Sequence, residues 1–238
     1  MGLKSFILAQ STSARTARAE IFRRSFHLDA TTKILDLGSE DGTNVNRAVH
    51  ESLILASNVT IADIDPTALE AGRQKFGYNT VLLDEASVLP FPDRHFDIVF
   101  CSSVIEHVTV PKSELWSVRS GKAFRSRSWG HQMQFASEIR RIGRQYFVQT
   151  PAKSFPIESH TWLPFMGYLP RRLLLPILQF TNAVWIKSAI PDFNLLGRAD
   201  MQQLFPDARI LGERRFGVAK SYMAIRSERD PGEGPSSP

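Results

Sequence analysis

The chain has 238 residues, of which 42% are hydrophobic and 22% are charged, and its formal net charge is +5. This composition is typical of a globular protein that buries a sizeable core, and it excludes a disordered or collagen-like chain. A single cysteine, Cys101, excludes an intramolecular disulfide and a metal site built from several cysteines. No apolar run is long enough to predict a membrane span or a secretory signal, so we expect a cytoplasmic protein.

Strands and helices alternate along most of the chain. Residues 1–30 are expected to form a lead-in with a short helix at 14–26. Short apolar runs bounded by turn residues predict strands at 33–38, 59–65, 80–85, 96–102 and 145–150, and helices are expected at 44–55, 66–76 and 132–142. This alternation implies parallel βαβ units in a doubly wound sheet.

The end of the chain follows a different pattern. Two further strands, at 207–213 and 220–226, are joined by a link so short that they must pair antiparallel. We therefore predict an α/β, Rossmann-like fold: a doubly wound seven-stranded sheet, mostly parallel, with a C-terminal antiparallel hairpin. The expected parts are the lead-in helix of 1–30, one domain over 31–226 with insertions near 111–130 and 151–198, and a disordered tail at 227–238.

The segment ILDLGSEDG, residues 34–42, carries the most information about a ligand. A strand runs through Asp36, and the chain turns at Gly38 and Gly42, where glycine permits positive φ and close approach of a ligand. Asp63 follows 21 residues after Gly42, at the end of the second strand. A carboxylate there is placed to accept hydrogen bonds from the ribose of an adenosine, which fits either a dinucleotide or an S-adenosyl ligand.

The charges in this turn separate the two ligands. A dinucleotide would place its pyrophosphate on the N-terminus of the following helix. Glu40 and Asp41 occupy that turn and would repel a pyrophosphate, but they would not oppose an ammonium and a sulfonium. The middle glycine of G-x-G-x-x-G is also missing, so we reject a dinucleotide.

These motifs together resemble the class I S-adenosylmethionine-dependent methyltransferases of the methyltransferase type 11 group, which are related to the quinone-biosynthesis methyltransferases. The matching segments are ILDLGSEDG (34–42), IADIDP (61–66), DEASVLPFPDRHFDIVF (84–100), SSVIEHV (102–108) and, more loosely, the closing residues 204–226. The family usually has glycine where Glu40 stands, so the backbone of this chain is less free at that point.

The resemblance implies a set of contacts with S-adenosyl-L-methionine. Residues near the methionine end would be Asp36, Gly38, Ser39 and Ser102, with Gly42 in the same turn. Asp63 would bind the ribose and Ile64 would pack on the adenine. The adenine amino group would meet Glu85, or Asp84 as the alternative, and the backbone N–H of Ala86.

Two histidines are candidate general bases for an acceptor that must lose a proton, His107 after the fourth strand and His160 after the fifth. A structural role, in which each binds loop backbone groups, is the alternative for both, and His131 is a weaker candidate. Glu106, His107, Glu158 and His160 lack the i, i+4 spacing of a helical zinc pair, so we expect no metal.

The acceptor is expected to be a small molecule or a lipid-linked molecule. Nucleic acid is disfavoured as the acceptor for two reasons. The [DN]-P-P-[FYW] box that is common in methyltransferases acting on a base amino group is replaced by CSSV at the fourth strand. Cys101 is interpreted as a buried small residue and not as a nucleophile for cytosine. The basic stretch 111–130 is interpreted as a solvated mobile loop, or as a lid that pairs with an anionic acceptor. The apolar block 163–186 is interpreted as a hydrophobic cap, or as a surface for peripheral contact with an anionic membrane.

We therefore predict an S-adenosylmethionine-dependent methyltransferase that transfers the methyl group in line to a small-molecule or lipid-type acceptor. The alternative is a non-catalytic module that keeps the fold and binds an S-adenosyl ligand or a partner. The sequence does not indicate an oligomeric state.

Overall fold

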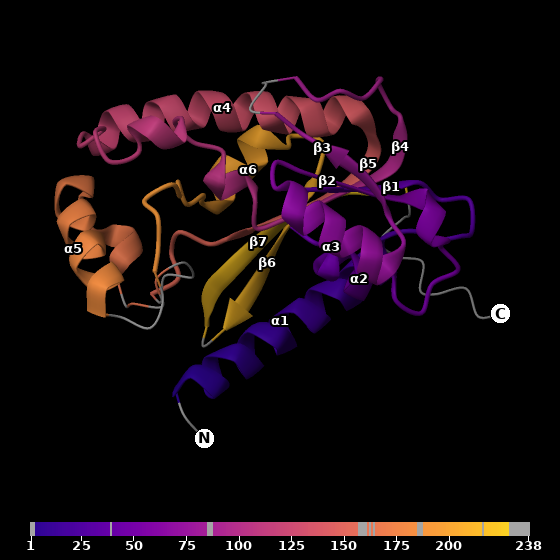
Figure 1. The fold of residues 1–238 in the computed structure, drawn as a ribbon, viewed down its shortest axis with the longest axis horizontal. Helices are drawn as coiled ribbons and strands as arrows, with labels where there is room; N and C mark the ends of the chain where they lie inside the picture. Colours follow the sequence, from indigo (N-terminus) through magenta and orange to yellow (C-terminus); the bar gives the residue numbers. More distant parts are fainter. Residues whose placement is uncertain are drawn as a thin grey trace. The chain divides into compact units, whose positions relative to one another are not determined.

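The computed structural model describes residues 3–38, 40–84, 88–156, 161, 163, 165–184, 188–215 and 217–228, with the side chains of 3–11 and 184 left out. Its strands form one seven-stranded sheet in the order β3-β2-β1-β4-β5-β7-β6 (Figure 1). The strands are β1 (Ile34–Leu37), β2 (Val59–Asp63), β3 (Asn79–Leu82), β4 (Phe96–Ser102), β5 (Gly143–Pro151), β6 (Arg209–Arg215) and β7 (Val218–Arg226).

The pairing in this sheet agrees with the pattern of the sequence. β1 pairs in parallel with β2 on one side and β4 on the other, and β2 pairs in parallel with β3. β6 and β7 are neighbours joined by two residues, a link that only antiparallel strands allow. The predicted fold class, a mostly parallel Rossmann-like sheet with an antiparallel C-terminal hairpin, is confirmed.

The helices are α1 (Leu3–Ser25), α2 (Thr43–Val49), α3 (Pro66–Phe76), α4 (Gly121–Ile142), α5 (Arg171–Val184) and α6 (Arg198–Leu204), with short 3-10 turns η1 (Ala56–Asn58), η2 (Ile105–His107), η3 (Lys112–Glu114) and η4 (Met166–Tyr168). α1 to α4 lie where helices were expected, although several bounds differ, and α5 and α6 were not predicted. α3 has the predicted bounds, because the Asp65 side chain accepts hydrogen bonds from the Thr67 and Ala68 N–H groups at its start. α1 begins earlier than expected, and α2 ends earlier, before Glu51 adopts a φ of 72°.

The basic stretch 111–130 is not the irregular loop that we expected, since α4 begins at Gly121. The face of α4 that is buried includes Phe124, Ser128, Gln132 and Ala136, at intervals of four residues. Two of these four side chains are polar, so the apolar period that predicts a helix is broken in the sequence. Ser128 and Gln132 are nevertheless fully buried, and they complete the inner stripe of the helix.

The chain divides into two compact units. Unit 1 comprises residues 1–102, 140–148 and 225–238, and unit 2 comprises residues 103–139 and 149–224. The domain bounds expected from the sequence stay predictions.

Unit 1 is built around buried aromatic side chains. In its interior the ring of Phe22, from α1, lies edge-on to Phe100 at 5.4 Å and to Phe147 at 5.6 Å. α1 also packs against α2, and α3 packs against β2 and β3 (Figure 1). Two residues of the predicted tail make hydrogen bonds in unit 1: the Ser227 hydroxyl donates to the Ser25 carbonyl, and the Glu228 N–H donates to Gln145 at 2.9 Å. Residues 229–238 lie outside the described part.

Unit 2 contains an apolar cluster beneath α5, in which Leu174 and Leu178 pack with Met166 and Phe193. The guanidinium of Arg171, at the start of α5, is buried as well. It lies 3.5 Å from the ring centre of Phe124 and donates to the carbonyls of Leu115, Val118 and Pro191 at 2.6, 2.7 and 3.0 Å. Desolvation lowers the pKa of Arg171 to about 10, which still leaves the side chain charged at neutral pH.

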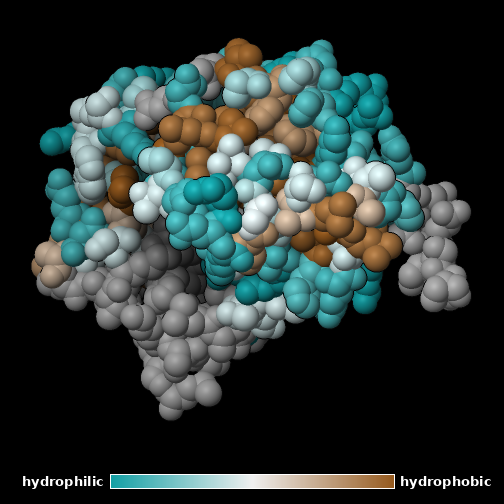
Figure 2. Space-filling view, turned by 45° about the vertical axis from the view of Figure 1, so that its right-hand side comes forward, coloured by the Kyte–Doolittle hydropathy of each residue, from teal (hydrophilic) through white to brown (hydrophobic). Residues whose placement is uncertain are grey.

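Hydrophilic residues predominate on the face shown in Figure 2, and the exposed hydrophobic residues gather there in separate patches. Among the described residues, no helix is both long enough and apolar enough to cross a bilayer. Cys101 is buried in β4, as expected for a small residue of the core.

Candidate functional site

The loop between β1 and α2 has an unusual backbone. Gly38, Glu40 and Gly42 all have positive φ, at 76°, 62° and 74°. A Cβ atom at Gly42 would come within 2.9 Å of the Ile61 side chain, so both the conformation and the packing require glycine there. Glu40 adopts the left-handed conformation although it has a side chain, at the position where the resembled family usually has glycine.

Asp63 fixes this loop. The residue is 8% exposed, and its carboxylate accepts hydrogen bonds from the backbone N–H groups of Glu40 at 2.9 Å and Asp65 at 3.0 Å. A further hydrogen bond, from the Gly38 N–H to the Ala62 carbonyl at 2.8 Å, also joins the end of β1 to the end of β2. A carboxylate has about four lone-pair sites, so Asp63 retains the capacity to accept bonds from ribose hydroxyls.

Asp36 is buried in the middle of β1, and its charge acts on Tyr78. The Tyr78 hydroxyl donates to Asn46 Oδ1 at 2.8 Å. Burial, and secondarily the negative charge of Asp36, raise the pKa of Tyr78 to about 12. Tyr78 therefore stays neutral in the physiological range.

The structure changes the electrostatic interpretation of Asp41. Its side chain accepts hydrogen bonds from the N–H and hydroxyl of Thr43 and from Lys75 Nζ, the last at 3.3 Å. Burial raises the pKa of Asp41, but these bonds outweigh burial and place the pKa below its ordinary value. Because Lys75 compensates the Asp41 charge, Glu40 alone supplies the repulsion that we expected both acids to exert on a pyrophosphate.

Apolar side chains are exposed where β2 and β3 end. Ile64 follows β2 and is 46% exposed, and Leu82 ends β3 and is 59% exposed. Asp63 and Leu82 are partners in the parallel register, so these two apolar residues lie at the same edge of the sheet. Of the other predicted cofactor residues, Asp84 is exposed and Ser102 is half-buried at the end of β4, whereas Ser39, Glu85 and Ala86 lie outside the described residues.

The candidate base His107 lies in unit 2 and is paired with an acid distant in the sequence. Its Nδ1 lies 3.1 Å from Oδ2 of Asp192, and a third of its side chain is exposed. The Asn194 N–H donates to the Glu106 carbonyl at 2.7 Å, and the Thr109 hydroxyl donates to the Asp192 carbonyl at 3.0 Å. The turn that holds His107 and the segment that holds Asp192 are therefore bound to each other on both sides of the pair.

The remaining candidates for acid–base or metal chemistry have other surroundings. Glu106 is fully buried and accepts a hydrogen bond from the Thr150 hydroxyl at 2.9 Å. Nδ1 of His131 lies 2.6 Å from the Thr109 carbonyl, a structural contact. Glu158 and His160 lie outside the described residues. Among the residues that are described, no three His, Cys, Asp or Glu side chains lie close enough together to hold a metal ion.

Three residues of these sites were not found from the sequence. Tyr78 contacts the glycine loop, Lys75 compensates Asp41, and Asp192 pairs with His107. Each interaction joins residues at least 32 positions apart, and no local pattern of a single sequence indicates such a pairing.

Comparison with known proteins places the fold and the loop in one class. Residues 35–118 match the family model of a methyltransferase domain, and this match together with the fold confirms the resemblance to the class I, type 11 methyltransferases. Among curated proteins, the chain is 35% identical over 86 residues to the ubiquinone/menaquinone biosynthesis C-methyltransferase UbiE of Shewanella pealeana. The match covers 32% of this chain and 33% of that protein, so the chain matches about a third of the relative's length.

Solved structures show the same fold at low identity. Loganic acid methyltransferase, solved with SAH, has a TM-score of 0.54 at 13% identity, covering 85% of this chain and 72% of that chain. Geranyl diphosphate C-methyltransferase from Streptomyces coelicolor has a TM-score of 0.52 at 12% identity, covering 92% and 82%.

Proposed function

We propose that the chain is an S-adenosylmethionine-dependent methyltransferase that acts on a small-molecule acceptor. The observation that carries this proposal is the glycine loop after β1, which Asp63 binds through Glu40, within the segment that matches the methyltransferase domain model. When bound, S-adenosylmethionine supplies a methyl group on a positively charged sulfur.

The residues of unit 1 fit this cofactor. Asp63 has lone pairs left for the ribose hydroxyls, and Ile64 with Leu82 offers an apolar surface for the adenine. The buried carboxylate of Asp36 supplies negative charge that suits the ammonium of the methionine end. Gly38, Ser39, Gly42, Asp84, Glu85, Ala86 and Ser102 complete the proposed contacts.

His107 is the proposed general base for an acceptor that must lose a proton. With its proton on Nδ1, the imidazole donates to Asp192, and Nε2 carries the lone pair that takes the acceptor's proton. The pairing with Asp192 favours His107 over His160 for this role.

The acceptor is proposed to be apolar or lipid-linked, with an anionic group. On α5, Leu173, Ile177 and Phe180 are exposed on a face opposite the buried cluster. Four cationic residues of the basic stretch are exposed and have no ion pair among the described residues: Lys112, Arg119, Lys122 and Arg125. The curated relative is named for quinone biosynthesis, which agrees with an apolar acceptor.

The alternative is a non-catalytic module, and the positive φ of Glu40 in the ligand loop is the observation that favours it. Two titrations and a turnover assay distinguish the two functions. Calorimetry with S-adenosylhomocysteine, with NAD as comparison, should give micromolar binding of the first and none of the second. Failure to bind S-adenosylhomocysteine would overturn the cofactor assignment. Binding without methyl transfer to any member of a panel of phenols, quinols and carboxylates would favour the non-catalytic module.

A further inference from the structure

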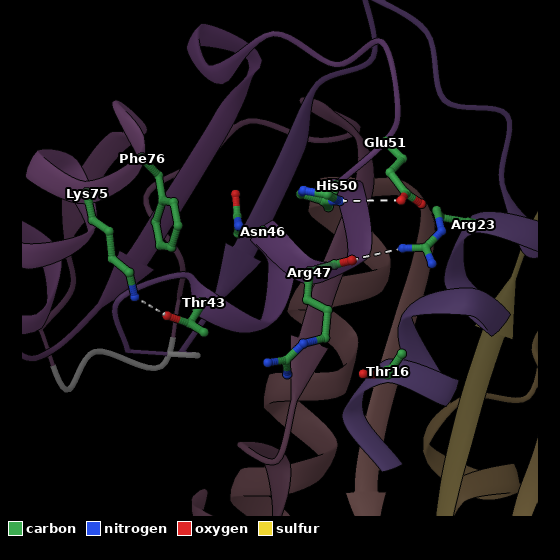
Figure 3. Close-up of a pocket in the computed structure, with 9 residues that line it drawn as sticks. All are labelled: Thr16, Arg23, Thr43, Asn46, Arg47, His50, Glu51, Lys75 and Phe76. Carbon is green, nitrogen blue, oxygen red and sulfur yellow. Dashed lines mark hydrogen bonds and ion pairs between the residues drawn. The ribbon is translucent and has the colours of Figure 1, made fainter. Parts of the chain in front are cut away.

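A hollow lies in unit 1, among α1, α2 and α3, and it contains none of the predicted cofactor residues (Figure 3). Its volume is about 460 Å³, and its lining includes Thr16 and Arg23 from α1 and Arg47 from α2. Pockets for small organic ligands have volumes of roughly 300–1,000 Å³, so the hollow has room for a molecule larger than an inorganic ion.

The lining is predominantly cationic. Arg23, Arg47 and Lys75 come from three different helices, and Glu51 is the single carboxylate among the lining residues. Oε1 of Glu51 lies 3.9 Å from Nδ1 of His50. Within the described residues neither Arg23 nor Arg47 forms an ion pair, so two permanent positive charges face a hollow that holds one carboxylate.

The two arginines differ in what holds them. Nη1 of Arg23 donates to the carbonyls of Arg47 and Ala48 at 2.9 and 3.5 Å, at the C-terminal end of α2, where a cation is favoured. The Nη1 atom of Arg47 is buried without a hydrogen-bond partner among the described residues. Figure 3 shows its guanidinium pointing away from Arg23, with Thr43 on one side and Thr16 on the other, and with no interaction drawn to its nitrogens.

We propose that this hollow binds the phosphate group of a small soluble molecule, with Arg47 as the principal contact and Arg23 contributing charge. A guanidinium pairs with phosphate through two parallel N–H···O bonds, a geometry that a half-buried arginine on a short helix can offer. The anion would pair with the guanidinium of Arg47, whose Nη1 has no hydrogen-bond partner among the described residues. The polar side chains of Thr16 and Asn46 would contact the rest of the ligand.

The test is a calorimetric titration of the full chain with inorganic pyrophosphate, at fixed ionic strength, with and without saturating S-adenosylhomocysteine. We expect binding that S-adenosylhomocysteine leaves unchanged and that Arg47→Gln weakens at least tenfold. The matched control is Arg24→Gln, which removes the same charge from an exposed position of α1 and should leave pyrophosphate binding unaltered. Thermal unfolding of both variants checks that each is folded.

Three results would overturn the proposal. Equal losses in Arg47→Gln and Arg24→Gln would show attraction to the general positive charge, and competition by S-adenosylhomocysteine would place pyrophosphate in the other site. Binding to vesicles that contain phosphatidic acid, without binding to pyrophosphate, would assign the charge to a lipid surface. Because the titration needs no methyl transfer, its outcome is independent of the proposed enzymatic function.

Discussion

The carboxylate of Asp63 holds the backbone N–H of Glu40 at 2.9 Å, and in doing so it ties the end of β2 to the loop that follows β1. Glu40 is held in the left-handed region, which costs a residue with a side chain roughly 1–2 kcal/mol. Asp63 therefore both orders the loop and faces the proposed position of the ribose.

Replacing this acid should weaken cofactor binding. We expect Asp63→Ala to lower the affinity for S-adenosylhomocysteine by about 1–3 kcal/mol, the scale of a lost charge-assisted hydrogen bond. Asp65→Ala is the control, because it removes the N-cap of α3 and should lower stability by about 1 kcal/mol without changing affinity. Calorimetry and urea unfolding measure the two effects, and an unchanged affinity in Asp63→Ala would remove it from the site.

Glu40→Gly should make the protein more stable. Glycine removes the cost of positive φ but loses more conformational entropy on folding, so the expected gain is up to about 1 kcal/mol. Glu40→Ala removes the charge and keeps the Cβ atom, and it should show no such gain. Denaturant unfolding of both variants separates backbone strain from charge, since an equal gain in the alanine variant would identify repulsion as the cause.

Tyr78 should ionise later than an ordinary tyrosine. Its pKa is raised to about 12, so the folded state holds this proton more tightly than the unfolded state. The corresponding contribution to stability is fully present below pH 10 and is lost as pH rises towards 12. Ultraviolet titration of the folded protein should show a late tyrosinate that is missing in Tyr78→Phe, and an unchanged late part of the titration in that variant would contradict this.

His107→Ala should reduce methyl transfer by about 10²–10⁴-fold if the imidazole removes a proton from the acceptor. Affinity for S-adenosylhomocysteine should be unchanged. Asp192→Asn should reduce turnover less and should shift the pH profile, because it alters the group that orients the imidazole. The exposed His27→Gln is the control, and an unaltered rate in His107→Ala would assign His107 a structural role.

The exposed face of α5 should bind membranes if the acceptor is lipid-linked. Phe180→Ser should lower binding to phosphatidylglycerol vesicles about tenfold, since a buried aromatic ring contributes on the order of 1.5–3 kcal/mol. Leu53→Ser removes an equally exposed apolar side chain from unit 1 and should have no effect. Co-sedimentation measures both, and absence of wild-type binding would leave a soluble small molecule as the acceptor.

Local signals in the sequence were sufficient for most of the parallel sheet. β1, β2 and β4 are buried apolar runs bounded by turn residues, and α3 carries its start signal in Asp65 and Pro66. α4 was only half predicted, because Ser128 and Gln132 place polar atoms on its buried face. Burial of such residues depends on partners elsewhere in the chain: Gln132 donates to the carbonyl of Ile105 and exchanges bonds with Asn194.

In the candidate site, too, features set by local sequence could be predicted, and pairings between distant residues could not. The glycines and Asp63 could be proposed from the sequence because their spacing follows from one βαβ unit, whereas the pairing of Asp192 with His107 could not, because 85 positions separate them. The compensation of Asp41 by Lys75 was missed for the same reason, and with it half of the electrostatic argument against a pyrophosphate.

The guanidinium of Arg171 links several segments of unit 2, so these segments are expected to unfold together. It binds carbonyls at 115 and 118 before α4, the ring of Phe124 within α4, and the carbonyl at 191 after α5. A flat group with divergent N–H donors can serve all of these at once, which the point charge of a lysine cannot do. Release of α5 would leave several backbone carbonyls without their hydrogen-bond donor at the same time. Amide hydrogen exchange across these three segments should therefore proceed as one cooperative event.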